Sequence, residues 1–186
     1  MKVAIIGGIG SGKSAVLSRF KELGYTTLSA DEINAQMLKD PEYQAKLEEL
    51  FPGVVVNGVV NKKELSQRVF NNPYELAKLN HLAHPEICKR MREETADPVI
   101  IEVPLIFESN TQDMFDEIIL VTAKKKIRLE RLEGRGVEKK RAKLIMWNQV
   151  SDRKLRKIAT KEIDNSFGLD ELNQAVDKVI GEIFNK

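Results

Sequence analysis

A short glycine-rich segment near the start of the chain constrains the fold more than any other feature. Residues 7–14 read Gly-Gly-Ile-Gly-Ser-Gly-Lys-Ser and fit the pattern G-x-x-x-x-G-K-[ST]. An apolar run precedes them at 3–6, and a helical pattern follows at 15–20. Several backbone N–H groups can approach one anion only where side chains are small, and the start of the next helix adds partial positive charge. The segment therefore predicts a phosphate-binding turn between a buried strand and a helix.

The chemistry expected of this turn is divided between its backbone and two side chains. Lys13 would reach the β- and γ-phosphates of a nucleoside triphosphate, and the Ser14 hydroxyl would supply one ligand to Mg²⁺. The nucleotide-binding residues that the pattern predicts are Gly8, Ile9, Gly10, Ser11, Gly12, Lys13, Ser14 and Ala15. Residues 10–15 also read G-x-G-x-x-A with Asp31 beyond them, as in dinucleotide-binding sites. That alternative gives no role to Lys13 or Ser14, so ATP and Mg²⁺ are the expected cofactors.

Short apolar runs alternate with longer helical stretches along much of the chain. Each run is apolar at both odd and even positions, which is typical of strands buried on both faces. The expected strands cover residues 3–6, 25–28, 99–103, 117–121 and 161–163. Residues 169–184 carry apolar side chains along one stripe and predict an amphipathic helix that returns to the sheet. The fold class is therefore α/β, with a five-stranded parallel sheet flanked by helices.

The composition fits a single domain over residues 1–186 that carries an insertion. The chain has 186 residues, of which 42% are hydrophobic and 31% charged, enough to bury a core without disulfides. Its one cysteine, Cys88, cannot form an internal disulfide and is most simply a packed residue. His81 and His84 lie three positions apart, but no third ligand stands at metal-binding spacing. We therefore expect neither a zinc site nor a catalytic thiol.

Charge and hydropathy exclude several classes of partner. The net charge of +2 is too small to indicate binding to nucleic acid or to an anionic membrane. The first residues turn polar and glycine-rich too early for a secretory signal, and no apolar run approaches the ~18 residues of a membrane span. We expect a cytoplasmic protein that binds a small molecule and neither nucleic acid nor membrane. The sequence leaves its oligomeric state open.

The alternation of strands and helices stops over about residues 40–97, which predicts a helical insertion. Asp40 and Asn72 each stand directly before a proline and can cap the start of a helix. Turn signals enclose a short extended piece at 54–56. His84 also precedes a proline, and a residue in that position is biased away from helix. We expect His84 either to mark a break in the helix or to touch a substrate.

A basic segment over about residues 124–147 follows the fourth expected strand. Arg128, Arg131 and Arg135 recur there at helical spacings of three and four. Glycines flank Arg135 on both sides, which indicates a helix end where a lid can bend. The alternative, arginines on a solvated surface beside glutamates, fits Arg128 best and Arg135 least. We predict a basic lid that closes over ATP.

The reaction class follows from what accompanies the glycine turn. A GTPase should carry a D-x-x-G switch and an N-K-x-D base reader, and neither occurs in the sequence. A kinase with a separate acceptor instead needs a second pocket, a carboxylate near the acceptor hydroxyl, and cations over the transferring phosphoryl group. Candidates for all three are present, so the sequence favours a kinase.

Asp31 is the candidate carboxylate. It follows the second expected strand and so belongs at the same carboxyl edge of a parallel sheet as the glycine turn. It can equally be an acidic first-turn residue of a helix that Ser29 and Glu32 open with a capping box. If it serves the site, it orients the acceptor hydroxyl and takes its proton late in a loose transition state. Glu102, at the end of the third strand, is either a carboxylate near Mg²⁺ or a solvated acid.

Several short motifs follow one another in an order that a known family shares. They are residues 7–14, Ala30-Asp31, Val69-Phe70, Leu79-Asn80, His84-Pro85-Glu86-Ile87, residues 103–108, Arg131, Arg135, Gln149 and residues 163–166. Each is weak alone, but their order and spacing together are specific. Over nearly its whole length the chain resembles the dephospho-coenzyme A (dephospho-CoA) kinases, which are P-loop kinases.

The resemblance implies strand order 2-3-1-4-5, an acceptor-binding insertion at about 40–97 and a lid at about 124–147. It implies transfer of the ATP γ-phosphoryl group to the ribose 3′-hydroxyl of dephospho-CoA, the last step of coenzyme A biosynthesis. Asp31 would be the base and Arg135 an ATP-side arginine, which with Lys13 completes the catalytic set. The acceptor-binding residues that it implies are Asn80, His84, Pro85 and Glu108.

Some positions depart from the family pattern. They are Ser29 for an aspartate, Ile6 for a threonine, Lys62 for an arginine and Thr160 for an acid. Ser29 matters most, because it removes a second carboxylate near Mg²⁺. Two other functions stay open: a nucleoside monophosphate kinase, which shares loop and lid, and a nucleotide-dependent binding module without catalysis.

Overall fold

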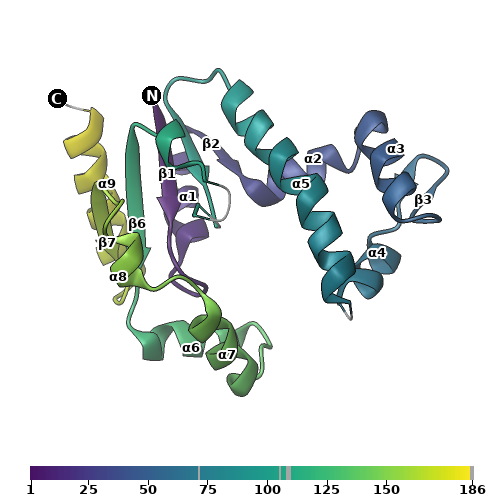
Figure 1. Ribbon diagram of the computed structural model, residues 1–186. Helices are drawn as coiled ribbons and strands as arrows, with labels where there is room; N and C mark the ends of the chain where they lie inside the picture. Colours follow the sequence, from purple (N-terminus) through teal and green to yellow (C-terminus); the bar gives the residue numbers. More distant parts are fainter. Residues whose placement is uncertain (71, 105, 108–109, 185–186) are drawn as a thin grey trace. The chain divides into compact units, whose positions relative to one another are not determined.

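The computed structural model describes residues 1–70, 72–104, 106–107 and 110–184, which form two compact units (Figure 1). The first unit consists of Met1–Leu28 and Thr95–Lys186, and the second consists of Ser29–Glu94. In the sequence, the second unit is therefore inserted between two strands of the first.

A five-stranded sheet forms the centre of the first unit. Its strands are β1 (Lys2–Ile6), β2 (Thr26–Ser29), β5 (Val99–Glu102), β6 (Glu117–Thr122) and β7 (Lys161–Asp164). They lie in the order β2-β5-β1-β6-β7, and β1 pairs in parallel with both β5 and β6. Counted along the chain as five strands, this order is 2-3-1-4-5. The α/β prediction and the implied strand order are both confirmed.

Apolar residues on both faces of the central strands explain why this sheet is buried. Val3 and Ile5 of β1 are fully buried in one core cluster. Ala4 and Ile6 are buried too, and they face the opposite side because side chains alternate along a strand. Burying a valine or isoleucine side chain stabilises the fold by roughly 1.5–3 kcal/mol. The apolar runs at both parities thus correspond to a sheet covered on both faces.

Two helices cover one face of the sheet. α1 (Lys13–Glu22) packs against β1 and β5, and α9 (Leu169–Phe184) packs against β7 and α1. The predicted apolar stripe of α9 is confirmed, since Leu172, Val176 and Ile183 are buried. α1 begins directly after the glycine turn, so its packing fixes the turn at the end of β1.

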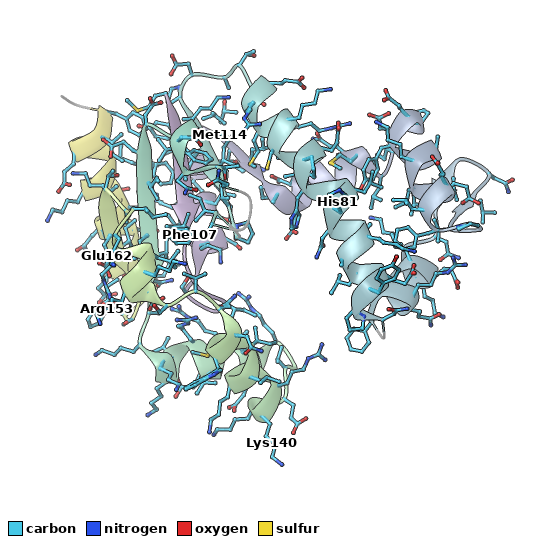
Figure 2. The ribbon with its side chains drawn as sticks, in the orientation of Figure 1. His81, Phe107, Met114, Lys140, Arg153 and Glu162 are labelled. Atoms are coloured by element: carbon cyan, nitrogen blue, oxygen red, sulfur yellow. The ribbon has the colours of Figure 1, made fainter. Side chains whose placement is uncertain are left out.

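The remaining helical segments described in the first unit lie between its later strands. They are η1 (Gln112–Met114), α6 (Lys125–Gly134), α7 (Lys139–Asn148) and α8 (Asp152–Leu155). α6 packs against α7. Basic side chains project from this pair into solvent, as Lys140 of α7 does in Figure 2.

Four helices and a hairpin make up the described part of the second unit. They are α2 (Ala30–Met37), α3 (Pro41–Leu50), β3 (Val55–Val56), β4 (Val59–Val60), α4 (Lys62–Phe70) and α5 (Pro73–Glu93). Both predicted caps are confirmed. The Asp40 carboxylate accepts a hydrogen bond from the Glu42 N–H, and the Asn72 side chain accepts from the Tyr74 N–H.

The hairpin is one structural difference from the sequence analysis, which expected a single extended piece at 54–56. β3 and β4 instead pair antiparallel. Asn57 and Gly58 connect them with φ angles of 51° and 73°. An Asn-Gly turn with two positive φ angles is typical of tight hairpins. Val54 and Val60 then bury their side chains in the small core of this unit, which stabilises the second strand.

The expected helix break at His84 is wrong, because α5 continues through Pro85 to Glu93. A proline inside a helix removes the hydrogen bond to the carbonyl four residues earlier. Buried residues on either side of it, Ala83 and Cys88, keep the helix packed. At 21 residues α5 is long, yet no described helix combines the length and apolar character needed to cross a membrane.

Candidate active site

The glycine turn between β1 and α1 adopts a conformation that only small residues permit. Gly12, the residue before α1, has a φ of 98°, in the left-handed region. A Cβ placed there would lie 2.0 Å from Nδ2 of Asn165, and one on Gly8 would lie 2.1 Å from Nη2 of Arg128. Neighbouring side chains therefore fill the space that glycine leaves.

Three side chains from two other parts of the first unit, α6 and the residue after β7, bind the carbonyl groups of the turn. Arg128 Nε donates to the Ile9 carbonyl at 2.8 Å. Arg131 Nη1 donates to the carbonyls of Gly10 and Ser11 at 3.3 and 3.2 Å, and Asn165 Nδ2 donates to Ser11 at 2.8 Å. The backbone carbonyls of the turn thus face fixed donors.

The direction of the amide groups follows from those carbonyl contacts. In a trans peptide the N–H of one residue points opposite to the C=O of the residue before it. The N–H groups of Gly10 and Gly12 therefore point away from the arginines. In the described part of the chain, neither these two nor the Ser14 N–H donates a hydrogen bond. Ser11 Oγ is also buried without a partner there. These donors suit a bound polyanion.

Arg128 and Arg131 of the basic segment bind the glycine turn, which differs from the surface position that the sequence favoured for Arg128. Arg128 is only 8% exposed, so its assignment as the best candidate for a surface arginine is wrong. Besides binding Ile9, it lies 3.6 Å from the Asp152 carboxylate. Arg131 Nη2 donates to both Oδ1 and the backbone carbonyl of Asn165. The helical spacing identified these arginines but not the direction in which each one points.

Lys13 and Glu102 form the charged pair at the edge of the sheet. Their Nζ and Oε1 atoms lie 3.9 Å apart, and the side chains are 12% and 15% exposed. Glu102 reaches this position because β5 pairs with β1, with Ile5 opposite Glu102. A solvated acid is therefore not the right description of Glu102. Next to Lys13, Ser14 and Ala15 begin α1 with exposed side chains.

Among the described residues, the Ile9 amide is the one N–H of the turn that donates a hydrogen bond to a distant side chain. Gln149 Oε1 accepts its hydrogen bond at 2.7 Å. Gln149 follows the end of α7 and, with Gly7 and Gly8, lines a cavity of about 120 Å³. In the sequence, Gln149 belongs to a motif of the resembled family and has no assigned role. A contact across 140 positions leaves no local pattern by which it could be found.

Arg135 occupies the predicted helix end. α6 ends at Gly134, Arg135 caps it, and Gly136 follows with a φ of 79°. The Arg135 side chain is exposed, unlike those of Arg128 and Arg131. It is available to a ligand, whereas the other two are engaged with the turn.

In the second unit, Asp31 lies in the first turn of α2. Ser29 and Glu32 form the expected capping box, with the Glu32 N–H donating to Ser29 Oγ at 3.1 Å. The cap is thus complete without Asp31. Asp31 is exposed, and its carboxylate forms no hydrogen bond or ion pair with any residue that the structure describes.

The remaining acceptor candidates lie on or near α5. Asn80 and His84 are half-buried and Pro85 is exposed. Glu108 lies outside the described residues. Within the described ranges, no group of three or more His, Cys, Asp or Glu residues could hold a metal ion. Cys88 is buried, as expected of a packed residue, and this desolvation raises the pKa of its thiol.

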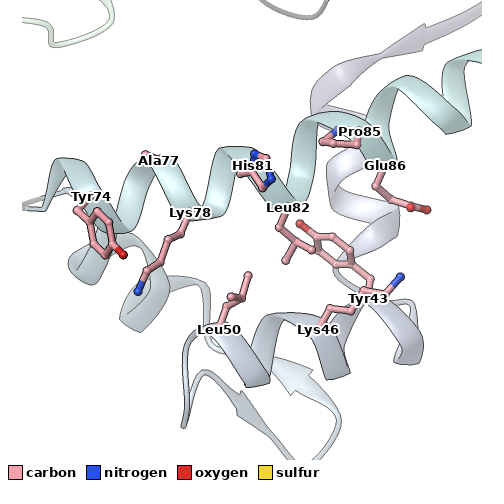
Figure 3. A pocket seen from close by; sticks show the side chains of 10 residues that line it. All are labelled: Tyr43, Lys46, Leu50, Tyr74, Ala77, Lys78, His81, Leu82, Pro85 and Glu86. Atoms are coloured by element: carbon pink, nitrogen blue, oxygen red, sulfur yellow. The ribbon is translucent and has the colours of Figure 1, made fainter.

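The second unit also contains a cavity of about 630 Å³ between α3 and α5 (Figure 3). Residues of both helices line it, among them Tyr43 and Leu50 of α3 and Ala77, Leu82 and Pro85 of α5. Of the three candidate acceptor residues that the structure describes, Pro85 alone is among them. No sequence motif indicated this cavity, because its walls come from two helices.

Comparisons with known proteins agree with one another. The family described as "Dephospho-CoA kinase" matches residues 1–171. The dephospho-CoA kinase of Deinococcus radiodurans is 33% identical over 190 residues, covering 98% of this chain and 92% of that protein. That of Rhizobium meliloti is also 33% identical, with 97% of each chain covered.

Solved structures give the same result for the fold. A dephospho-CoA kinase from Campylobacter jejuni superposes with a TM-score of 0.73 at 26% identity, covering 100% of this chain and 98% of the other. A shikimate kinase from Acinetobacter baumannii has a TM-score of 0.60 at 14% identity, with 99% and 93% covered. The second likeness concerns the fold alone.

Proposed function

The chain belongs to the dephospho-CoA kinase family, and from this we infer that it transfers the γ-phosphoryl group of ATP to dephospho-CoA. The reaction forms an ester at the ribose 3′-hydroxyl and yields CoA and ADP. The structural observation that carries the proposal is the glycine turn. Its carbonyls are bound by Arg128, Arg131 and Asn165, which leaves amides of Gly10, Gly12 and Ser14 for phosphate oxygens.

The first part of the mechanism is charge neutralisation. The transition state of phosphoryl transfer spreads negative charge over the equatorial oxygens, so fixed donors and cations stabilise it most. Lys13 supplies such a cation, and the nearby Glu102 carboxylate at 3.9 Å limits where its ammonium group can move. Within the predicted Gly8–Ala15 segment, the amides of Gly10, Gly12 and Ser14, together with the start of α1, bind the phosphate chain.

Magnesium is the second component that we propose. Mg²⁺ would supply positive charge to the phosphate oxygens. Magnesium bound together with substrate phosphates needs only one or two protein ligands, so a cluster of protein carboxylates is not required. The exposed Ser14 hydroxyl on the first turn of α1 fits the single protein ligand.

Asp31 is the residue that we assign to the acceptor. As an exposed carboxylate without a protein partner in the described chain, it can accept a hydrogen bond from the 3′-hydroxyl. A hydroxyl held in this way attacks in line and loses its proton to Asp31 as the bond to phosphorus forms. The first helical turn that carries Asp31 is fixed by the capping box of Ser29 and Glu32.

The lid and the insertion complete the proposal. The lid, at about residues 124–147, carries Arg135, which adds positive charge to the transferring group and excludes water that would otherwise hydrolyse ATP. The insertion, at about residues 40–97, binds dephospho-CoA with Asn80, His84, Pro85 and Glu108. A small-molecule acceptor and a cytoplasmic location suit this activity.

The rates of ADP release with different acceptors test this function. We expect dephospho-CoA to stimulate release at least tenfold more than any nucleoside monophosphate at the same concentration. A monophosphate that matches it would support the nucleoside monophosphate kinase instead. If the protein binds ATP but no acceptor stimulates ADP release, the result would support a nucleotide-binding module without catalysis.

A further inference from the structure

The cavity between α3 and α5 has the size and lining of a small-molecule site. Its volume of about 630 Å³ falls within the roughly 300–1,000 Å³ typical of ligand pockets. Leu50, Ala77, Leu82 and Pro85 supply apolar walls, and Tyr74 adds an exposed aromatic ring at the rim. Such walls suit the hydrocarbon part of a ligand.

A buried hydroxyl group supplies a specific polar contact in this cavity. Tyr43 lines it and is only 3% exposed, and its hydroxyl has no hydrogen-bond partner in the described chain. Figure 3 shows the Tyr43 side chain reaching from α3 toward Leu82 of α5. Burial raises the pKa of the phenol, so it remains a donor at neutral pH. A buried donor without a partner favours a ligand that brings an acceptor.

Each Lys or Glu side chain that lines the cavity has an ion-pair partner on its own helix. Lys46 lies 3.0 Å from Glu42, and Lys78 lies 3.1 Å from Glu75. Glu86 lies 3.3 Å from Arg90 in the same way. The cavity therefore offers no unpaired cation for a phosphate among the described residues that line it. The expected ligand is neutral, elongated and largely apolar, with hydrogen-bond acceptors.

We propose that this cavity binds the pantetheine arm of dephospho-CoA, with the Tyr43 hydroxyl donating to one of its amide carbonyls. The assignment rests on the proposed function, which supplies the acceptor. The arm is neutral and elongated, with two amides, a dimethyl-substituted carbon and a terminal thiol. Those groups match an apolar cavity with one buried donor better than the charged nucleotide part of the same molecule does.

Disulfide trapping tests this assignment without relying on turnover. A cysteine introduced by Ala77→Cys would attack the disulfide of oxidised dephospho-CoA, forming a mixed disulfide and releasing one dephospho-CoA thiolate. Leu76→Cys is the matched control, because Leu76 is the adjacent exposed residue and does not line the cavity. The unmodified protein measures the background from Cys88, which is 8% exposed.

We expect mass spectrometry to show at least tenfold faster coupling at position 77 than at position 76. Pantethine, the disulfide of the arm alone, should show the same preference, and AMP should not protect position 77. Equal rates at the two positions would overturn the proposal. Protection by AMP would also overturn it, because the cavity would then bind the nucleotide part.

Kinetics give a second and independent readout. Ala77→Phe fills the cavity and should raise KM for dephospho-CoA at least tenfold with KM for ATP unchanged, whereas Leu76→Phe should change neither. Tyr43→Phe removes only the hydroxyl and should raise KM for dephospho-CoA several-fold. Unchanged KM in Ala77→Phe contradicts the pocket assignment alone. Absence of turnover with dephospho-CoA in the unmodified enzyme contradicts the proposed function itself.

Discussion

The glycine turn of the first unit and the α3–α5 cavity of the second differ in whether their polar groups have hydrogen-bond partners within the protein. In the turn, Arg128, Arg131 and Asn165 bind the backbone carbonyls and thereby fix the amides before any ligand arrives. In the cavity, the Tyr43 hydroxyl is buried without a partner in the described chain. The contrast agrees with the two roles proposed above: a preorganised phosphate site, and an acceptor pocket whose buried hydroxyl the ligand binds.

Loss of the Lys13 charge should have the largest effect on the preorganised side. Lys13→Ala removes the cation beside the transferring phosphoryl group, so we expect kcat to fall by about 10³ or more. Steady-state kinetics with dephospho-CoA measure this. Lys21→Ala, on the same helix and exposed, is the control and should stay near the unmodified rate. A fall below tenfold in Lys13→Ala would remove Lys13 from the mechanism.

Asp31→Asn separates acceptor chemistry from phosphate binding. We expect kcat to fall by about 10² to 10³, the range typical of a positioned general base, with ATP affinity unchanged. Calorimetry with ATP and steady-state kinetics provide the two readouts. Glu32→Gln is the control, because it changes the neighbouring side chain on the same helix, α2. Glutamine can still form the capping box with Ser29. Near-normal turnover in Asp31→Asn would show that another group holds the hydroxyl.

Two neighbouring arginines test whether the fixed carbonyls matter. Arg131→Met frees the carbonyl of Gly10 and leaves that of Ser11 to Asn165 alone, so we expect a loss of about 1–3 kcal/mol in unfolding free energy and weaker ADP binding. Arg135→Ala should leave the melting temperature unchanged, because its side chain is exposed, while lowering kcat at least tenfold. Thermal melts and kinetics of both variants distinguish these roles. Similar melting temperatures and similar kinetics in the two variants would contradict a structural role for Arg131 and a catalytic role for Arg135.

The Gln149→Ala substitution tests whether the Ile9 amide can bind a phosphate oxygen of the nucleotide. The variant releases an N–H that Gln149 Oε1 binds at 2.7 Å. If a phosphate oxygen then takes that donor, ADP affinity should rise several-fold, consistent with a net gain of about 1 kcal/mol per hydrogen bond. Calorimetric titration with ADP measures it. Weaker binding would show that Gln149 supports the turn and that Ile9 is not a phosphate ligand.

The smallest effect is expected from a half-buried ion pair in the second unit. The Arg90 side chain, which donates to Asp40 at 2.6 Å, lowers the pKa of that carboxyl group, and the Glu42 N–H adds to this. A lowered folded-state pKa contributes stability above the unfolded pKa, near 4, that is lost as pH falls through the folded value. Urea unfolding from pH 7 to 3 should show a shallower loss in Asp40→Asn, which keeps the cap. The same pH dependence of unfolding free energy in the unmodified protein and in Asp40→Asn would contradict a stabilising role for the Asp40 charge.

Local signals in the sequence predicted most of the scaffold. Buried strands, helix caps at Asp40 and Asn72, and the Ser29–Glu32 capping box depend on neighbouring residues and are confirmed. The continuous helix through Pro85 was missed, because packing against other helices outweighs the cost of one lost hydrogen bond.

The part of the site that residues adjacent in sequence form could be predicted. The glycine turn was found because several glycines must lie together in sequence. The contacts of Arg128 and Gln149 with Ile9 span 119 and 140 positions and depend on the tertiary fold. The α3–α5 cavity has no motif for the same reason, since its residues share only a spatial position.

The position of the new phosphate on the product shows whether the γ-phosphoryl group of ATP reaches the ribose 3′-hydroxyl. Enzyme, ATP and dephospho-CoA are combined, and ³¹P NMR follows the new phosphate ester while ADP is measured in the same samples. We expect one ribose 3′-phosphate to form for each ADP released. ADP accompanied by inorganic phosphate, or by an ester at any other position, would contradict it.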